Sequence, residues 1–287
     1  AKMFNIPSIN NVTGLGTVFI RQNFTSKIAQ LLYKFAFYFP KKVLFQNKDD
    51  KQLFLDLGLI KEKITDLVPG SGVDTKYFIT KKKEKVAVLE GQTQEQEDIE
   101  NEIEIKEKPF VFLLIARLLY DKGILEYIEA IKILREKNPT VQFQLLGKID
   151  TDKGLGISRE IVEVWQKEGL ITYLGRVNDV RSLIENADCV VLPSYREGTP
   201  RTLLEAASMS KPLLATDVAG CREVVEHNVN GFLCLPKNAQ DLANKMQLLL
   251  LSSKERLKEM GKASRQIAIN KFDQSLVIKK YYEVMNL

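Results

Sequence analysis

Residues that bind transition metals or form disulfides are scarce in this sequence. Its 287 residues include one histidine and three cysteines. Cys189, Cys221 and Cys234 form no CxxC pair, which predicts reduced thiols rather than a zinc site or a disulfide framework. His227 lies in a polar stretch that is typical of an exposed turn. We therefore predict no metal site and no cofactor, while a magnesium ion held by carboxylates stays open as an alternative.

Acidic residues are missing from the first 48 residues. In this basic part, Lys27, Lys34, Lys41 and Lys42 alternate with aliphatic and aromatic residues. Such a mixture can lie on an anionic membrane surface, and the apolar run is too short to span a bilayer. A core helix with its lysines in water is an equally weighted alternative. No nucleic-acid-binding motif accompanies the charge, so we predict no nucleic-acid partner.

Composition divides the chain into three parts. Turn-rich residues 68–74 separate a first part, 1–72, from a longer second part, 73–270. Within the second part, residues about 81–108 are mostly charged or glutamine, which predicts a mobile, solvated insert. The third part, residues 271–287, is predicted to be a helix that returns toward the first part.

Strand-like and helix-like stretches alternate regularly after residue 108. Continuous apolar runs predict strands at residues 110–116, 141–146, 171–174, 189–192, 213–216 and 232–235. Such runs, separated by helices, indicate an α/β protein with a doubly wound parallel sheet that is covered on both faces. Ligands of these sheets bind beyond the carboxyl ends of the strands. In the first part of the chain we expect strands at residues 7–12 and 42–46 and a short helix at 49–57.

Two cations follow the first strand of the second part. Arg117 and Lys122 come after the run that ends near residue 116. Arg117 offers a bidentate fork and Lys122 a point charge, and each charge-assisted hydrogen bond to a diphosphate is worth about 1.5–3 kcal/mol. Gly147 and residues 175–177 follow the next two strands, where a missing side chain lets a ligand ring approach the backbone. These strand ends predict a diphosphate site, with a nucleobase beside residues 175–177.

Two glutamates, Glu197 and Glu205, enclose a glycine turn and a predicted helix start after the strand at residues 189–192. Pro200 suits the first helical position because its φ is fixed near the helical value. A helix start attracts a diphosphate through unpaired N–H groups and the helix dipole, and a nearby carboxylate can accept hydrogen bonds from sugar hydroxyls. The segment therefore predicts a sugar-nucleotide site.

The segment Glu197–Glu205 also resembles the E-x7-E signature of the retaining, two-domain GT-B glycosyltransferases called family 4. Residues 69–74, 116–123 and 220–232 are similar to that family's landmarks and stand in the expected order. The sequence of residues 193–201 resembles that of the family members that build capsules, O-antigens and lipid-linked oligosaccharides. The resemblance covers essentially the whole chain apart from the charged insert.

This resemblance implies a GT-B fold with a carboxyl-terminal Rossmann-like lobe and a partial amino-terminal Rossmann-like lobe. It implies a hexosyltransferase that moves a sugar from a nucleotide-sugar with retention of anomeric configuration. The family resemblance implies a UDP-sugar as this donor. The implied acceptor is a polyprenyl-diphosphate-linked glycan in bacterial surface polysaccharide or glycoprotein synthesis. The enzyme would then be cytoplasmic and peripheral to the inner face of the plasma membrane.

The resemblance also implies roles for individual residues. Glu197 would contact the donor sugar near the reacting carbon, Arg117 and Lys122 would grip the diphosphate, and Glu205 would accept hydrogen bonds from the ribose. Substrate-binding positions would further include Gly198, Thr199, Pro200, Arg201, Thr202 and Leu203 around phosphate and sugar, Gly175, Arg176 and Val177 beside the base, Gly147 at another strand end, and Thr13 and Gly14 lining the cleft.

The chain departs from the family pattern in two ways. It begins at Ala1 without an initiator methionine and is expected to start midway through the amino-terminal lobe, with much of the acceptor side absent. Many relatives place a histidine near the donor sugar, where this chain has residues 11–16 without one. A truncated, non-catalytic nucleotide-sugar-binding remnant is therefore the main alternative.

Two other enzyme classes fit the sequence less well. A glycoside hydrolase would use Glu197 and Glu205 as its acid and nucleophile at a separation of about 5–5.5 Å, but it has no use for a cationic diphosphate site. A nicotinamide-dependent oxidoreductase would need a G-x-G-x-x-G motif after the first strand, which the sequence lacks.

Overall fold

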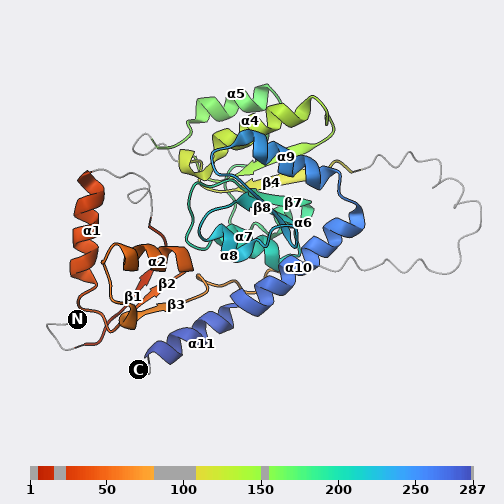
Figure 1. Ribbon diagram of the computed structural model, residues 1–287. Helices are drawn as coiled ribbons and strands as arrows, with labels where there is room; N and C mark the ends of the chain where they lie inside the picture. Colours follow the sequence, from red (N-terminus) through yellow and green to blue (C-terminus); the bar gives the residue numbers. More distant parts are fainter. Residues whose placement is uncertain (1–5, 16–23, 81–107, 150–154, 286–287) are drawn as a thin grey trace, which may run out of the picture.

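The computed structural model describes residues 6–15, 24–80, 108–149 and 155–285 and contains two parallel sheets (Figure 1). The small sheet has the order β1-β2-β3, with β1 at Ile9–Val12, β2 at Lys42–Phe45 and β3 at Thr65–Leu67. Beside it lie α1 at Phe24–Ala36 and α2 at Lys48–Asp56. We call this sheet with α1 and α2 the smaller lobe.

The larger lobe is built on a six-stranded sheet of order β6-β5-β4-β7-β8-β9. Its strands are β4 at Val111–Ile115, β5 at Gln142–Leu146, β6 at Thr172–Tyr173, β7 at Cys189–Leu192, β8 at Leu213–Thr216 and β9 at Gly231–Cys234. Its helices are α4 at Ile124–Arg135, α5 at Arg159–Lys167, α6 at Arg181–Asn186, α7 at Arg201–Ser208, α8 at Cys221–Val224, α9 at Ala239–Leu250 and α10 at Lys254–Phe272.

Helices cover both faces of the larger sheet. Apolar side chains of α4, α5 and α9 form a core on one face, and those of α6, α7, α8 and α10 form a core on the other. The central strands β4 and β7 are buried along their whole length, which is why their sequences are continuously apolar. The predicted doubly wound parallel sheet is confirmed.

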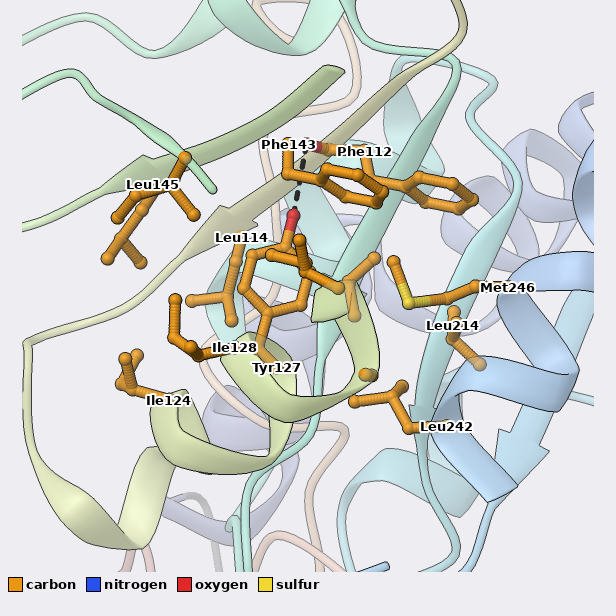
Figure 2. Packing of buried hydrophobic residues seen from close by; sticks show 14 of the residues in the cluster. Phe112, Leu114, Ile124, Tyr127, Ile128, Phe143, Leu145, Leu214, Leu242 and Met246 are labelled. Atoms are coloured by element: carbon orange, nitrogen blue, oxygen red, sulfur yellow. Dashed lines mark hydrogen bonds between the residues drawn. The ribbon is translucent and has the colours of Figure 1, made fainter. Parts of the chain in front are cut away.

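Aromatic and aliphatic side chains together fill the first of these cores (Figure 2). The rings of Phe112 and Phe143, from neighbouring strands, stack with centroids 5.8 Å apart. Tyr127 of α4 lies under them, and its hydroxyl donates a 3.2 Å hydrogen bond to the carbonyl of Phe112. Burial raises the pKa of Tyr127 well above its ordinary value, so this hydroxyl stays protonated. Each such side chain stabilises the fold by about 1.5–3 kcal/mol through burial.

The chain's last helix connects the two lobes. After α10, helix α11 at Gln274–Met285 runs along the small sheet (Figure 1). Val277 and Val284 of α11 are buried with Leu44 and Val68 of the smaller lobe, and the hydroxyl of Tyr281 accepts a hydrogen bond from Asn11. The predicted division at residue 72 and the span given to the insert stay predictions, since most of residues 81–108 lie outside the described ranges.

Element boundaries follow the sequence predictions closely with a few exceptions. The strands at 189–192 and 213–216 were predicted to the residue, and the other predicted strands are shorter by one to two residues or shifted by one. The structure adds β3, which was not predicted. It has three residues and offers too little periodicity to detect.

Candidate functional site

The site lies where the strand order of the larger sheet reverses. After β4 the chain forms β5 and β6 on one side of that strand, and it later forms β7, β8 and β9 on the other side. The loops that leave the adjacent strands β4 and β7 therefore diverge, and they leave a crevice at the carboxyl ends. Arg117 and Lys122 follow β4, and Glu197 follows β7, so the predicted residues meet at this switch point.

Lys122 and Glu197 form an ion pair across the crevice. The Lys122 Nζ and the Glu197 Oε1 are 2.6 Å apart, and the side chains are 18% and 14% exposed. Gly123 makes this approach possible, because a Cβ on its left-handed backbone (φ 70°) would lie 2.0 Å from the carbonyl oxygen of Pro193. Arg117 is exposed at the same strand end. A lysine ammonium has three protons, so Lys122 can bind Glu197 and a phosphate oxygen together.

Glu205 lies in helix α7, which starts at the end of the Glu197 turn. Its side chain is 10% exposed and accepts a 2.9 Å hydrogen bond from the Nε of Arg201, one turn earlier. Burial raises the pKa of the Glu205 carboxyl above its ordinary value of 4.5, and Arg201 offsets part of that rise. A buried carboxylate with one exposed cationic partner can exchange that partner for ligand hydroxyls.

The helix start differs by one residue from the prediction. Pro200 is the residue that precedes the helix, with φ −72° and ψ 114°, and Arg201 is the first helical residue. Its extended ψ keeps Pro200 outside the helix although its φ is suitable. The N–H of Leu203 already donates to the carbonyl of Pro200, and the Leu203 side chain is fully buried. Leu203 is therefore poorly placed to bind phosphate directly, whereas Thr202 is half-buried at the helix start.

A cavity of about 640 Å³ opens beside Glu205. Its lining comprises Ser71, Gly72, Val73, Asp74, Tyr77, Phe78, Asn178, Asp179, Val180, Arg201, Glu205 and Gln274. The cavity thus joins the predicted ribose-binding glutamate to the segment directly after residues 175–177. It is large enough for a nucleoside, and most of its exposed surface is polar.

The predicted base-contacting residues lie next to this cavity rather than among its described lining residues. Gly175 adopts a left-handed conformation, φ 69°, and a Cβ there would meet no atom within 4 Å. The adjacent side chains, Arg176 and Val177, are exposed. Packing explains the glycine at position 147, because a Cβ on Gly147 would lie 1.7 Å from the carbonyl oxygen of Ala116. Its own carbonyl accepts a 2.8 Å hydrogen bond from the hydroxyl of Tyr173.

The smaller lobe reaches the same loop. A Cβ on Gly198 would lie 2.0 Å from the carbonyl oxygen of Thr13, and Gly14 lies directly beside Gly198. The hydroxyl of Thr199 donates to the carbonyl of Gln46 over 3.1 Å. Thr13 and Gly14, predicted to line the cleft, are therefore placed against the Glu197 turn.

Sequence reasoning missed a set of inter-lobe contacts at the first turn of α2. Asp50 forms an ion pair with Arg196, and Asn47 donates a 3.2 Å hydrogen bond to the carbonyl of Gly198. The only local signal was the helix cap, since Asn47 accepts a hydrogen bond from the backbone N–H of Asp50. That signal predicts a helix start and says nothing of a partner about 150 residues away.

The described part of the chain has neither a cluster of metal-binding side chains nor a membrane-spanning helix. Within residues 6–15, 24–80, 108–149 and 155–285, no group of three or more histidine, cysteine or carboxylate side chains is arranged to hold a metal ion. No helix in those ranges combines the length and the hydropathy needed to cross a bilayer.

Comparison with known proteins places these features in a family. Residues 95–267 match the family model described as glycosyl transferases group 1. The chain is 31% identical over 277 residues to the N,N'-diacetylbacillosaminyl-diphospho-undecaprenol alpha-1,3-N-acetylgalactosaminyltransferase of Campylobacter jejuni, covering 95% of this chain and 68% of that protein. It is 26% identical to the UDP-Gal:alpha-D-GlcNAc-diphosphoundecaprenol alpha-1,3-galactosyltransferase of Escherichia coli, covering 91% of this chain and 64% of that protein.

A solved structure shows the same fold. HepE from Anabaena, in complex with UDP and glucose, superposes with a TM-score of 0.77 at 21% identity. The superposition covers 99% of this chain and 73% of HepE. The chain spans only 46% of a third relative, the capsular polysaccharide biosynthesis glycosyltransferase CapM of Staphylococcus aureus.

Proposed function

This chain belongs to the group 1 glycosyl transferases and has their GT-B fold, and we propose that it transfers a sugar from a UDP-sugar to a polyprenyl-diphosphate-linked glycan. Two relatives whose names specify undecaprenol-diphosphate acceptors support the acceptor class. The UDP bound by HepE supports the donor. Assignment to family 4 and retention of anomeric configuration belong to the same proposal and rest on the E-x7-E spacing of Glu197 and Glu205.

The observation that carries the proposal is the meeting of cations and carboxylates at the switch point of the larger sheet. In this proposal Arg117 and Lys122 stabilise a diphosphate leaving group, which their position after β4 supports, and Glu205 opens on a cavity of nucleoside size. A hydrolase pair of glutamates would need both carboxyls directed at one glycosidic bond. Here Glu197 is paired with Lys122 and Glu205 with Arg201, which favours donor binding.

The proposed reaction needs no group beyond these residues and the substrates. The bond between the sugar's anomeric carbon and the diphosphate breaks, and a bond to the acceptor hydroxyl oxygen forms on the same face. The hydroxyl proton passes to the departing phosphate. Arg117 and Lys122 stabilise the negative charge that develops on UDP, while Glu197 orients the sugar.

Isothermal titration with UDP tests the donor site. Arg117→Ala and Glu205→Ala should each weaken UDP binding by roughly 10- to 100-fold, the loss expected when one charge-assisted hydrogen bond is removed. Arg256→Ala and Glu259→Ala, which remove an ion-paired Arg and Glu on α10, are the matched controls and should bind UDP as the unchanged chain does. Unaltered affinity in both site variants would refute the donor-site assignment.

We further propose that helix α1 holds the protein on the anionic inner face of the plasma membrane. Phe24, Leu31, Leu32 and Phe35 of α1 are 62–78% exposed, which is unusual for large apolar side chains. Lys27 and Lys34 are exposed on the same helix. Apolar side chains can enter the headgroup region while the lysines bind lipid phosphates, and no acidic residue in this part of the sequence opposes them. The acceptor would then be reached from the cytoplasmic side.

Sedimentation with liposomes tests this contact. The chain should bind vesicles that contain anionic lipid and should bind neutral vesicles less, and Leu31→Ser with Phe35→Ser should abolish the binding. Leu251→Ser, at a 75% exposed leucine of the larger lobe, is the matched control and should leave binding intact. Equal sedimentation with neutral and anionic vesicles would remove the proposal.

A further inference from the structure

An ion pair whose carboxylate is buried and whose guanidinium side chain is 23% exposed joins the two lobes beside the Glu197 turn. Asp50, in the first turn of α2, is 1% exposed and pairs with the guanidinium of Arg196, the residue before Glu197. Asn47 donates to the second carboxylate oxygen of Asp50 over 3.0 Å and to the carbonyl of Gly198 over 3.2 Å. The residues on both sides of Glu197 are therefore bound to the same helix start of the other lobe.

The Asp50–Arg196 pair differs in energy from the neighbouring pair of Asp49 and Arg222. On the same turn, Asp49 pairs with Arg222 over 2.6 Å, but those side chains are about half exposed. An exposed pair contributes little, whereas removal of one partner of a buried pair leaves an uncompensated charge out of water. Asp50 therefore favours one arrangement of the lobes, the one in which Arg196 reaches it. Asp49 imposes no comparable constraint.

We propose that Asp50 is a positioning residue for the donor sugar: through Arg196 it fixes the Glu197 turn in its sugar-binding orientation when the smaller lobe is docked. The inference rests on the proposed function, because it takes Glu197 as the sugar contact. It separates two halves of donor recognition. Arg117, Lys122 and Glu205 come from the larger lobe alone and bind the nucleotide, while the turn that meets the sugar depends on a side chain of the smaller lobe.

Titrations that compare UDP with a UDP-sugar distinguish positioning from a general structural role. UDP-glucose, UDP-galactose and their N-acetylated forms are titrated first into the unchanged chain, and the tightest binder is kept. In Asp50→Asn, UDP affinity should stay within about twofold, while the affinity for the UDP-sugar relative to UDP should fall about tenfold or more. Asp49→Asn, on the same turn, should change neither value. The variant Arg196→Lys, which keeps the charge, should retain more of the sugar preference than Arg196→Ala.

The outcomes decide between the explanations. An unchanged ratio of the two affinities in Asp50→Asn overturns the inference, and so does an equal loss for UDP and UDP-sugar, which would indicate a structural role. A chain that binds no UDP refutes the proposed donor site instead. In that case hydrogen exchange of the peptide that spans residues 195–199 still tests positioning: exchange should quicken about tenfold in Asp50→Asn but not in Asp49→Asn. Equal exchange in the two variants would count against it.

Discussion

The two lobes differ in how completely each is covered. The larger sheet has a closed apolar core on each face, and its central strands have no exposed residue. The smaller sheet is packed against α2 on one side and α11 on the other, yet its helix α1 leaves a row of large apolar side chains in the open. The proposed nucleotide site would have a rigid frame in the larger lobe. The exposed row on α1 is the surface for which we propose membrane contact.

Beside the Glu197 turn, the contact between the lobes is made largely of backbone and charge. Gly198 of the larger lobe lies against the carbonyl of Thr13, and a Cβ on Gly220 would lie 1.7 Å from the carbonyl oxygen of Gly198. Around these glycines stand two arginine–aspartate pairs, Arg196–Asp50 and Arg222–Asp49. An interface of this kind favours a specific geometry more than a large binding energy, because close backbone contacts tolerate no added atom.

Paired phenylalanine substitutions should show the largest difference between the lobes. Phe112→Ala removes a fully buried ring that stacks on Phe143, and it should lower the free energy of unfolding by about 3–5 kcal/mol. Phe35→Ala removes a ring that is 68% exposed and should change that free energy by no more than about 0.5 kcal/mol. Urea unfolding measures both. A large loss for Phe35→Ala would mean that the exposed row on α1 is buried in solution.

A methyl group at the lobe interface should have a smaller, more local effect. Gly198→Ala places a Cβ against Thr13, and since the position needs no left-handed backbone, the cost is steric, about 1–3 kcal/mol. The single tryptophan, Trp165, lies in the core of the larger lobe. Its fluorescence therefore reports unfolding of that lobe, whereas circular dichroism reports both.

We expect Gly198→Ala to separate the unfolding transition seen by Trp165 fluorescence from the one seen by circular dichroism. The fluorescence midpoint should stay near that of the unchanged chain, and the circular dichroism transition should begin at lower denaturant, because the smaller lobe loses support from its neighbour. Gln52→Ala, at an exposed position of α2, should leave the two transitions coincident. Coincident transitions in Gly198→Ala would show that the lobes unfold as one unit.

The same contrast between the lobes explains what the sequence could predict. The strands at residues 189–192 and 213–216 were found to the residue because a buried parallel strand is a continuous apolar run. Lys122 and Glu197 lie in contact, as expected where the carboxyl ends of neighbouring parallel strands share an edge, and Arg117 follows the same strand as Lys122. The glycosyltransferase prediction is confirmed by the family match. The individual roles of the site residues stay predictions.

Contacts between the lobes could not be predicted in this way. Asp50 and Arg196 are separated by 146 positions, and each has an ordinary local explanation, a helix first turn and a loop. Pairing depends on how two rigid bodies meet, which hydrophobic periodicity does not encode. The position of Pro200 outside α7 was missed for a smaller reason: φ suits the helix, and only the observed ψ excludes it.

The smallest expected effect concerns Glu205 and separates binding from stability. Burial raises the pKa of this carboxyl above 4.5, so the folded state binds the proton more tightly than the unfolded state does. Protonation of Glu205 should therefore increase the free energy of unfolding below pH 4.5. This added stability should be lost as the pH rises through the raised pKa. Glu205→Gln, which carries no charge, should escape that loss.

The variant should consequently be slightly more stable than the unchanged chain at pH 7.5, and the difference should vanish near pH 4. Loss of the bond to the largely exposed Arg201 subtracts about 0.3–0.5 kcal/mol from this gain, so the net change should stay below about 1 kcal/mol. Unfolding curves at both pH values measure it, with Glu259→Gln, at an exposed side chain of α10, as the control. Higher stability joined to weaker UDP binding would show that the larger lobe keeps a buried carboxylate for its ligand at the expense of its own stability. Lower stability at pH 7.5 would mean that the pair with Arg201 outweighs burial, and that Glu205 belongs to the frame of the lobe rather than to its site.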